Sequence, residues 1–426
     1  MQNNFNNIIN KFRLKYDIIN YLIFKEKSMI KKIVLLIIIF LILIFGISAI
    51  IYSPEYMYRI LVYRESDIND FKIFPERYIE KSQNAFIYDY DLKEDIKKLN
   101  IKYSFKNIEH ENFLENFLIN TKTTSFIIIK NNKIIFEEYY NGFSRDSITT
   151  SFSSVKSVVS LLIGIAIDKG YINSEKDSIS KYIEEFKDSQ FEKITIEDLL
   201  LMRSNIKYKE GFLWFGDDAK TYYMPDLRNL ALKKLKIDKT YNGFFHYNNY
   251  HPLLLGLIIE RSTGKKVSQF LEEHLWTKIG TEFEASWSLD SEKSGFEKME
   301  SGLNFRPIDF IKIGSMLLNS GTWNGEKIIC EDWIKKSTFS DFPINNFEYS
   351  NSFLENKNNS YKYMWYVLKN NIKGYDYFAA GKYGQFLYIS PENDIVILRT
   401  GKENGNIDWW PDFFNDLISV LSKKYL

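Results

Sequence analysis

Residues 151–170 read SFSSVKSVVSLLIGIAIDKG, and this stretch decides the fold. Its apolar residues recur at helical spacing and Gly170 is a typical helix end, so we predict a buried, central helix from about Ser154 to Lys169. Ser153 then lies at the helix N-terminus, and Lys156 returns to the same side one turn later. The helix start favours negative charge near Ser153, and desolvation favours a neutral Lys156 that acts as a base. We therefore predict that Ser153 is a nucleophile with a lysine partner.

The S-x-x-K pattern occurs several times in this chain, so its surroundings must select the functional copy. The other copies precede an apolar span, end a helix or lie in polar segments: Ser28/Lys31, Ser178/Lys181, Ser204/Lys207 and Ser262/Lys265. Only Ser153 opens a long apolar helix directly after a predicted hairpin.

The segments on either side of this helix predict one sheet with a helical insertion. Residues 125–130 and 133–139 are β-rich runs around Asn131-Asn132, which is typical of a two-residue hairpin. Helical patterns dominate from about 171 to 370, and strand patterns return at 385–390 and 394–400 before an amphipathic helix at 411–425. Strands at both ends around a helical middle favour a mixed α/β (α+β) domain. The helical patterns are clearest at Ile194–Met202, Pro252–Ser262 and Pro307–Asn319.

Five blocks of the sequence, in this order, resemble the serine β-lactamase-related hydrolases. The resemblance covers roughly residues 124–400 and is nearest to class C β-lactamases, esterases, D-amino-acid peptidases and 6-aminohexanoate-oligomer hydrolases of that fold. It implies a β-lactamase/transpeptidase-like domain, with a five-stranded antiparallel sheet flanked by helices, an all-helical lobe and the active site between them. The blocks are SFSSVKS at 151–157, ITIEDLLLM at 194–202, YNN at 247–249 before Leu255-Gly256 and Thr263-Gly264, Gly302-Leu303 with Asp309, and GKYGQ at 381–385.

The resemblance also implies a role for each matching residue. Ser153 would be the acylated nucleophile, Lys156 its neighbouring base, and Tyr247 the relay that carries the proton to the leaving group. Asn249 would orient Lys156 and the substrate.

The third motif would complete this site. Lys382 and Gly384 would lie on the strand at the edge of the cleft, with the Lys382 ammonium holding Tyr247 as phenolate or binding a substrate carboxylate. The backbone N–H groups of Ser153 and Gln385 would form the oxyanion hole.

Two departures from the family pattern bear on the substrate. Tyr383 stands where penicillin-binding relatives carry a small hydroxyl residue, which removes a donor to a β-lactam carboxylate, adds bulk and argues against efficient β-lactam hydrolysis. The usual Ser-Gly after the second block is Arg203-Ser204-Asn205 here, so that loop is expected to differ in shape.

Composition narrows the alternatives. The 56 Lys+Arg and 55 Asp+Glu nearly cancel, which argues against a nucleic-acid partner. We expect no cofactor and no metal, because the four histidines form no ligand motif and Cys330 is the single cysteine. We therefore expect a serine hydrolase acting on a small-molecule or peptide-like amide or ester. The alternative is a catalytically silent protein of the same fold that binds envelope peptides or glycans.

The N-terminal part predicts a membrane anchor. Residues 33–52 carry no charge and are long enough to cross a bilayer, which favours a transmembrane helix over a cleaved signal peptide. Basic residues predominate before this span, so the positive-inside rule predicts a cytoplasmic N-terminus and an extracytoplasmic catalytic domain. Met29 is an alternative start with the same topology. The predicted parts are a cytoplasmic basic N-terminus at 1–32, the helix at 33–52, an extracytoplasmic stalk or N-terminal extension at 53–120 and the hydrolase domain at 121–426.

Overall fold

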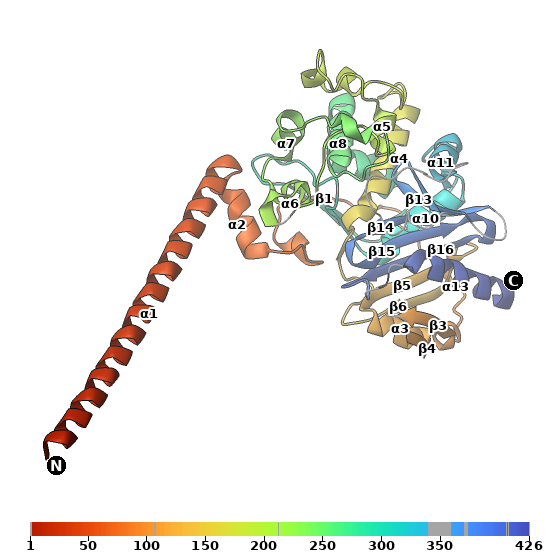
Figure 1. Ribbon diagram of the computed structural model, residues 1–426. Coiled ribbons are helices and arrows are strands. Elements are labelled where there is room, and N and C mark those ends of the chain that lie inside the picture. The colour runs from red at the N-terminus through yellow and green to blue at the C-terminus, as the bar shows by residue number, and fades with distance from the viewer. Residues whose placement is uncertain are drawn as a thin grey trace. The chain divides into compact units, whose positions relative to one another are not determined.

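The computed structural model describes residues 2–105, 108–211, 213–339, 359–369, 374–405, 407 and 409–425. The chain divides into two compact units, Met1–Arg64 and Glu65–Leu426. Figure 1 shows both units.

The first unit consists of two helices, α1 (Gln2–Ile51) and α2 (Pro54–Tyr63). Ser53 separates them by accepting a hydrogen bond from the Tyr56 N–H at the start of α2, where Pro54 occupies the first turn. Within α1, Ile19–Ile51 is long and apolar enough to cross a membrane, a property that signal sequences share. Its side chains from 33 to 43 are exposed to solvent.

The second unit is built on an eight-stranded sheet in the order β12-β13-β14-β15-β16-β5-β6-β2. All neighbours are antiparallel except β2 and β6, which are parallel. The strands of this sheet are β2 (Asp89–Tyr90), β5 (Thr123–Lys130), β6 (Lys133–Tyr139), β12 (Asn359–Lys362), β13 (Trp365–Lys369), β14 (Tyr375–Gly381), β15 (Gln385–Ser390) and β16 (Ile395–Gly401).

The predicted hairpin is confirmed as β5 and β6. Asn131 and Asn132 both have positive φ, at 50° and 55°, which is the conformation that a two-residue turn of this kind requires. The strand predicted at 385–390 is β15 with the same bounds, and the one predicted at 394–400 is β16, shifted by one residue.

The prediction of a five-stranded, wholly antiparallel sheet is wrong. The hairpin of β12 and β13 lies in a region that we read as helical, and the short parallel strand β2 comes from the predicted stalk. The turn between β12 and β13 is Tyr363-Met364, with φ of 44° and 64°. Neither residue is typical of that turn, so the sequence carries no hairpin signal there.

The sheet lies between helices on its two faces (Figure 1). Phe414 of α13 (Trp410–Tyr425) contacts the rings of Phe386 and Tyr388 on β15. On the other face, α10 (Pro307–Leu318) approaches β15 and β16 at Gly314, where any Cβ would collide with Val396. Because side chains alternate along a strand, these contacts bury both faces of the sheet.

The predicted central helix is confirmed as α4 (Val155–Asp168), which packs against α8 and is followed by Gly170 at a φ of 75°. The other helices of this unit are α3 (Leu114–Asn120), α5 (Ile196–Leu200), α6 (Asp217–Tyr223), α7 (Leu227–Lys233), α8 (Tyr250–Thr263), α9 (Val267–Leu271) and α11 (Glu331–Thr338). The smaller sheets comprise β1 (Glu76–Ile79), β7 (Thr149–Thr150), β8 (Ala285–Ser288) and β9 (Leu303–Phe305) in one, β3 (Asn100–Phe105) with β4 (Ile108–Phe113), and β10 (Thr322–Trp323) with β11 (Glu326–Lys327).

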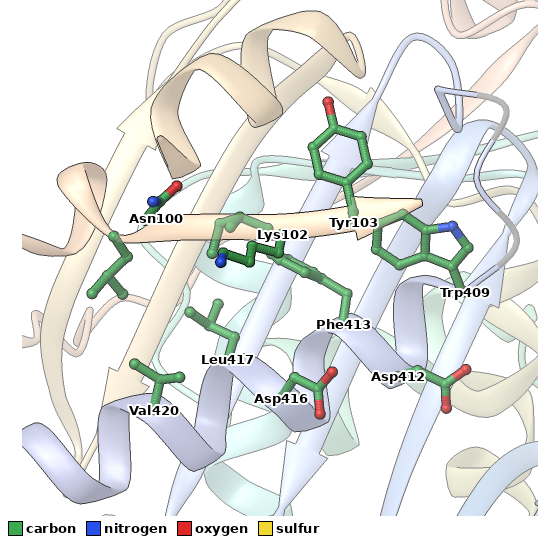
Figure 2. A pocket seen from close by; sticks show the side chains of 11 residues that line it. Asn100, Lys102, Tyr103, Trp409, Asp412, Phe413, Asp416, Leu417 and Val420 are labelled. Carbon is green, nitrogen blue, oxygen red and sulfur yellow. The ribbon is translucent and has the colours of Figure 1, made fainter. Parts of the chain in front are cut away.

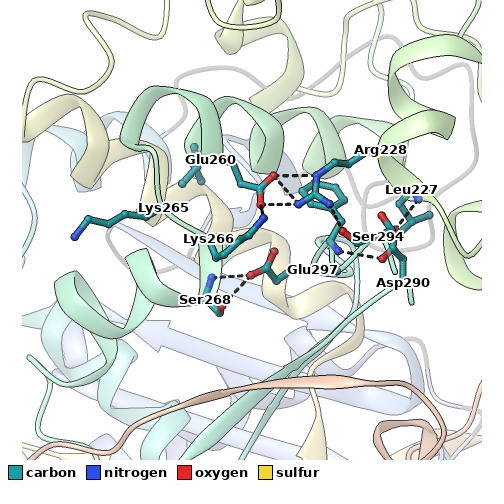
Figure 3. A network of polar contacts seen from close by, with 12 residues as sticks. Leu227, Arg228, Glu260, Lys265, Lys266, Ser268, Asp290, Ser294 and Glu297 are labelled. Atoms are coloured by element: carbon teal, nitrogen blue, oxygen red, sulfur yellow. Dashed lines mark hydrogen bonds and ion pairs between the residues drawn. The ribbon is translucent and has the colours of Figure 1, made fainter. Parts of the chain in front are cut away.

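A polar network fixes the helices around the segment that precedes β9 (Figure 3). Arg228 on α7 forms a forked ion pair with Glu260 on α8, with Nη2 and Oε1 2.7 Å apart. Ser268 on α9 donates to the buried Glu297 carboxylate, and Arg77 on β1 also contacts it. Arg228 also donates to the Ser294 carbonyl, so α7, α9 and β1 all hold the segment that leads from residue 290 to β9.

Residues 65–120, part of the stalk or N-terminal extension predicted at 53–120, contribute β1, β2, the β3–β4 hairpin and α3 to the second unit. The β3 strand and α13 border a cavity of about 410 Å³ (Figure 2). Tyr103 and Phe413 line it together with two carboxylates of α13, Asp412 and Asp416. None of the predicted site residues lines this cavity.

Candidate active site

The turn that presents Ser153 is held tightly on both sides. Ser151 donates from its backbone N–H to the Leu303 carbonyl of β9, at 2.8 Å, and its hydroxyl donates to the Ser301 carbonyl. Phe152 has a φ of 46°, a left-handed conformation that costs free energy in a non-glycine residue and is enriched at functional sites. Ser153 is partly exposed, whereas residues 151, 152 and 154–157 are buried. The turn thus leaves one hydroxyl accessible to a substrate.

Lys156 is placed beside that hydroxyl by its position one helical turn later. Its Nζ lies 2.8 Å from the Ser153 Oγ and donates a second hydrogen bond to the Glu300 carbonyl, at 3.1 Å. The side chain is 1% exposed, and this burial lowers the pKa of Lys156 to about 7, against the opposing charges of Glu300 and Glu210. A substantial fraction of Lys156 is therefore neutral near pH 7, and a neutral amine can accept the serine proton.

Tyr247 precedes the start of α8 and faces the same hydroxyl. The Lys156 Nζ lies 4.9 Å from the centroid of its ring. Burial raises the pKa of Tyr247 above its ordinary value, although a hydrogen bond with Ser153 acts in the opposite direction. Tyr247 is therefore protonated at neutral pH, and a protonated phenol can donate a proton.

The third motif reaches the nucleophile through a close backbone approach. A Cβ on Gly381 would lie 2.3 Å from the Ser151 carbonyl oxygen, so only glycine allows the end of β14 to pack against this turn. Gln385 begins β15 opposite Gly381 in the register and is 1% exposed, with its side chain bonded to the backbone of Gly401. The backbone of the third motif thus runs alongside the turn that carries Ser153.

A buried arginine holds the turn of this motif. Arg399 on β16 is fully buried, and its guanidinium donates to the carbonyls of Tyr383, at 3.3 Å, and Gly384, at 2.6 Å. Tyr383 and Gly384 both have positive φ, at 65° and 78°. Three further bonds go to Thr121, Thr123 and Glu403, so all five acceptors are neutral oxygens.

Two of the predicted site residues have partners other than those expected. The Lys382 ammonium contacts the Glu65 carboxylate at 3.1 Å and the Ser66 hydroxyl at 2.9 Å, and no contact with Tyr247 is described. The Asn249 side-chain amide donates a hydrogen bond to the Tyr208 hydroxyl, at 2.9 Å. No hydrogen bond between Asn249 and Lys156 is found among the described residues, and the role of Asn249 in orienting Lys156 and the substrate stays a prediction.

Sequence reasoning missed several charged residues around the site. Glu300 and Lys298 lie in the segment before β9, and Glu65 follows the first unit. No motif spacing marks any of these three, and only the folded chain brings them to the site. Among the described residues, no group of three or more His, Cys, Asp or Glu side chains is arranged to hold a metal ion.

Comparisons with known proteins find similar sequences and folds. A family model described as Beta-lactamase matches residues 112–294. The 6-aminohexanoate-dimer hydrolase of Paenarthrobacter ureafaciens is 25% identical over 322 residues, which span 70% of this chain and 76% of that protein. A Bacillus anthracis structure assigned provisionally as a 6-aminohexanoate-dimer hydrolase has a TM-score of 0.70 at 21% identity, covering 84% of this chain and 93% of its own. A class C β-lactamase structure has a TM-score of 0.54 at 14% identity, covering 72% of this chain and 94% of its own.

Proposed function

We propose, since this chain belongs to the serine β-lactamase-related hydrolase family, that it hydrolyses an amide or ester through an acyl-enzyme on Ser153. The observation that carries the proposal is the 2.8 Å contact between the buried Lys156 amine and the Ser153 hydroxyl. A serine hydroxyl is a weak nucleophile unless a neighbouring base removes its proton. Lys156 is the base within reach.

In the proposed reaction, each of these groups acts once in the acylation of Ser153 and once in its deacylation. Neutral Lys156 accepts the Ser153 proton as the hydroxyl oxygen attacks the carbonyl carbon, and the N–H groups of Ser153 and Gln385 stabilise the oxyanion. Tyr247 donates its proton to the leaving amine or alcohol as that bond breaks, and it regains a proton from the Lys156 ammonium. Water then attacks the acyl-enzyme by the same route and releases the acid and Ser153.

For the substrate we propose a linear amide or ester that ends in a carboxylate. The relative from Paenarthrobacter is named for a dimer of an amino acid, and such a dimer has one amide and one free carboxylate. Lys382, which is exposed and contacts the Glu65 carboxylate, would exchange that partner for the substrate carboxylate. The bulky Tyr383 beside it argues against efficient β-lactam hydrolysis.

Lys382→Met is expected to raise KM about fivefold for a substrate with a free carboxylate and to leave KM unchanged for its methyl ester, since an exposed ion pair contributes about 1 kcal/mol. Steady-state kinetics on the matched acid and ester would measure both values. An equal change for both substrates would exclude carboxylate binding by Lys382.

We also propose that α1 anchors the chain in a membrane, with the N-terminus in the cytoplasm and the catalytic unit outside. In cells that express the full chain with Cys330 replaced by serine, Lys187→Cys is expected to react with a membrane-impermeant maleimide, and Lys25→Cys only after the cells are lysed. Both positions are exposed. Labelling of Lys25→Cys in intact cells would contradict this orientation, and release of the chain into the medium would indicate a cleaved signal instead.

A fluorophosphonate probe tests the proposed function directly. Wild-type protein is expected to form a covalent adduct at Ser153, and Ser153→Ala is expected to form none, with mass spectrometry identifying the site. Ser262→Ala is the matched control, because Ser262 and Lys265 share the same spacing at the end of α8, and it should label like wild type. Folded wild type that stays unlabelled, and that binds peptides without turnover, would favour the silent binding protein instead.

A further inference from the structure

A second lysine and a carboxylate are buried on the segment whose backbone contacts Lys156. Lys298 and Glu300 lie on the segment before β9, with Nζ and Oε1 3.6 Å apart and side chains 1% and 3% exposed. The Lys298 ammonium also donates to the Tyr222 carbonyl and lies 4.3 Å from the centroid of the Phe74 ring. Burial of two opposite charges is costly, so such a pair often reflects a role other than stability.

Glu300 connects this pair to the nucleophile. Its carbonyl oxygen accepts from the Lys156 Nζ at 3.1 Å, so the backbone of Glu300 is in contact with the base. Ser301 donates to Glu300 Oε1 at 2.8 Å, whereas Oε2 is buried and has no hydrogen-bond partner among the described residues. Hydrogen bonds therefore stabilise only one oxygen of the carboxylate. Because the group is buried, solvent screens its charge little from the groups around it.

We propose that the buried Lys298–Glu300 pair is a positioning element that sets the protonation equilibrium of Lys156, and with it the pH at which Ser153 becomes reactive. The inference rests on the proposed function of the site and deepens it. The pair would act only through Lys156, without touching the substrate.

The charges that face Lys156 define the direction of the effect. Burial lowers the pKa of Lys156, whereas the Glu300 and Glu210 carboxylates raise it. Burial also raises the pKa of Tyr247 and of Tyr222, so both phenols stay neutral. Asp70 accepts a hydrogen bond from the Tyr222 hydroxyl, and burial raises its pKa as well.

Removal of the Glu300 charge should shift the acid limb of the pH–rate profile, which is the part where the rate rises with pH. The rate rises with pH as Lys156 loses its proton, so a lower pKa of Lys156 moves this limb to lower pH. Glu300→Gln is expected to move it down by about one pH unit. Lys298→Met, which leaves Glu300 without its cation, is expected to move it up.

The experiment measures the rate of Ser153 phosphonylation by a fluorophosphonate between pH 5 and pH 10 in the full-length protein. Removing one partner of a buried ion pair destabilises a fold, whereas removing both leaves no unpaired charge. The double variant Lys298→Met/Glu300→Gln therefore accompanies the single variants. Because the Glu300 charge acts directly on Lys156, the double variant should also shift the limb to lower pH, by less than Glu300→Gln. Glu297→Gln is the matched control, since it removes a buried carboxylate of the same segment that faces Arg77 instead, and its limb should stay in place.

An acid limb that is unchanged in the folded double variant, or that shifts equally in Glu297→Gln, would overturn the inference. Failure of the proposed function is a separate result, because wild type would then show no phosphonylation at any pH. In that case the ¹⁵N chemical shift of the Lys156 amine, assigned with Lys156→Met and followed against pH in wild type and the double variant, decides whether the pair controls this group.

Discussion

Replacing Lys156 with methionine is expected to lower kcat/KM by about 10³ to 10⁴-fold while leaving the protein folded. Methionine fills a similar volume but accepts no proton, so the Ser153 hydroxyl loses the base that lies 2.8 Å away. Stability should be unchanged or higher, because a buried ammonium is replaced by an apolar side chain. The measurement pairs steady-state kinetics with thermal unfolding of the same preparation.

Two further variants separate the role of Lys156 as a base from its role as a positive charge. Lys156→Arg keeps the charge but stays protonated at all accessible pH values, so it should be as inactive as the methionine variant. Lys207→Met removes an exposed lysine from another S-x-x-K copy, and it should retain full activity. If Lys156→Met kept activity within tenfold of wild type, another group would have to be the base.

Tyr247→Phe is expected to lower the rate of amide hydrolysis by about 10² to 10⁴-fold. The ring and its contact with Tyr361 remain, so the change removes one hydroxyl without leaving a cavity. An amine leaves only after it accepts a proton, whereas 4-nitrophenolate leaves without one. The loss should therefore be much smaller for a 4-nitrophenyl ester than for the matching anilide or alkyl amide.

The comparison of leaving groups is what makes the Tyr247 result decisive. Tyr171→Phe serves as the control, because Tyr171 and Asn173 repeat the same Y-x-N spacing at a position away from the site. An equal loss for ester and amide would indicate that Tyr247 acts before the leaving group departs, for example by orienting the Ser153 hydroxyl.

The parts of the fold that the sequence predicts well are those with local signals. Asn131-Asn132 adopts the positive φ of a hairpin turn, and the helix after Ser153 ends at Gly170, as their residue types indicate. The β12–β13 hairpin was missed because Tyr363 and Met364 form its turn without such residue types, and they are held there by tertiary contacts. Tyr363, for example, donates to Glu197 and packs on Trp333.

The candidate site also contains residues that a local sequence signal predicts and residues that no such signal marks. Motif spacing brought Ser153, Lys156 and Tyr247 into the prediction, and the structure brings these three side chains together. The partners of Lys382 and Asn249 were not predictable, because they depend on residues far along the chain, Glu65 and Tyr208. A buried ion pair such as Lys298–Glu300 has no sequence signature either, because two charged residues at this spacing are usually solvated.

Because Arg399 binds the backbone carbonyls of Tyr383 and Gly384, these hydrogen bonds hold the backbone of the third motif whichever side chains it carries at 382 and 383. That guanidinium is buried behind the motif, whereas the Lys382 side chain is exposed and the partly exposed Tyr383 donates to the Ser66 carbonyl and packs on Phe152. A library randomised at these two positions should retain the fold in most members and vary in the molecules it accepts. Selectivity in this protein could therefore diversify without rebuilding the scaffold that makes the chemistry possible.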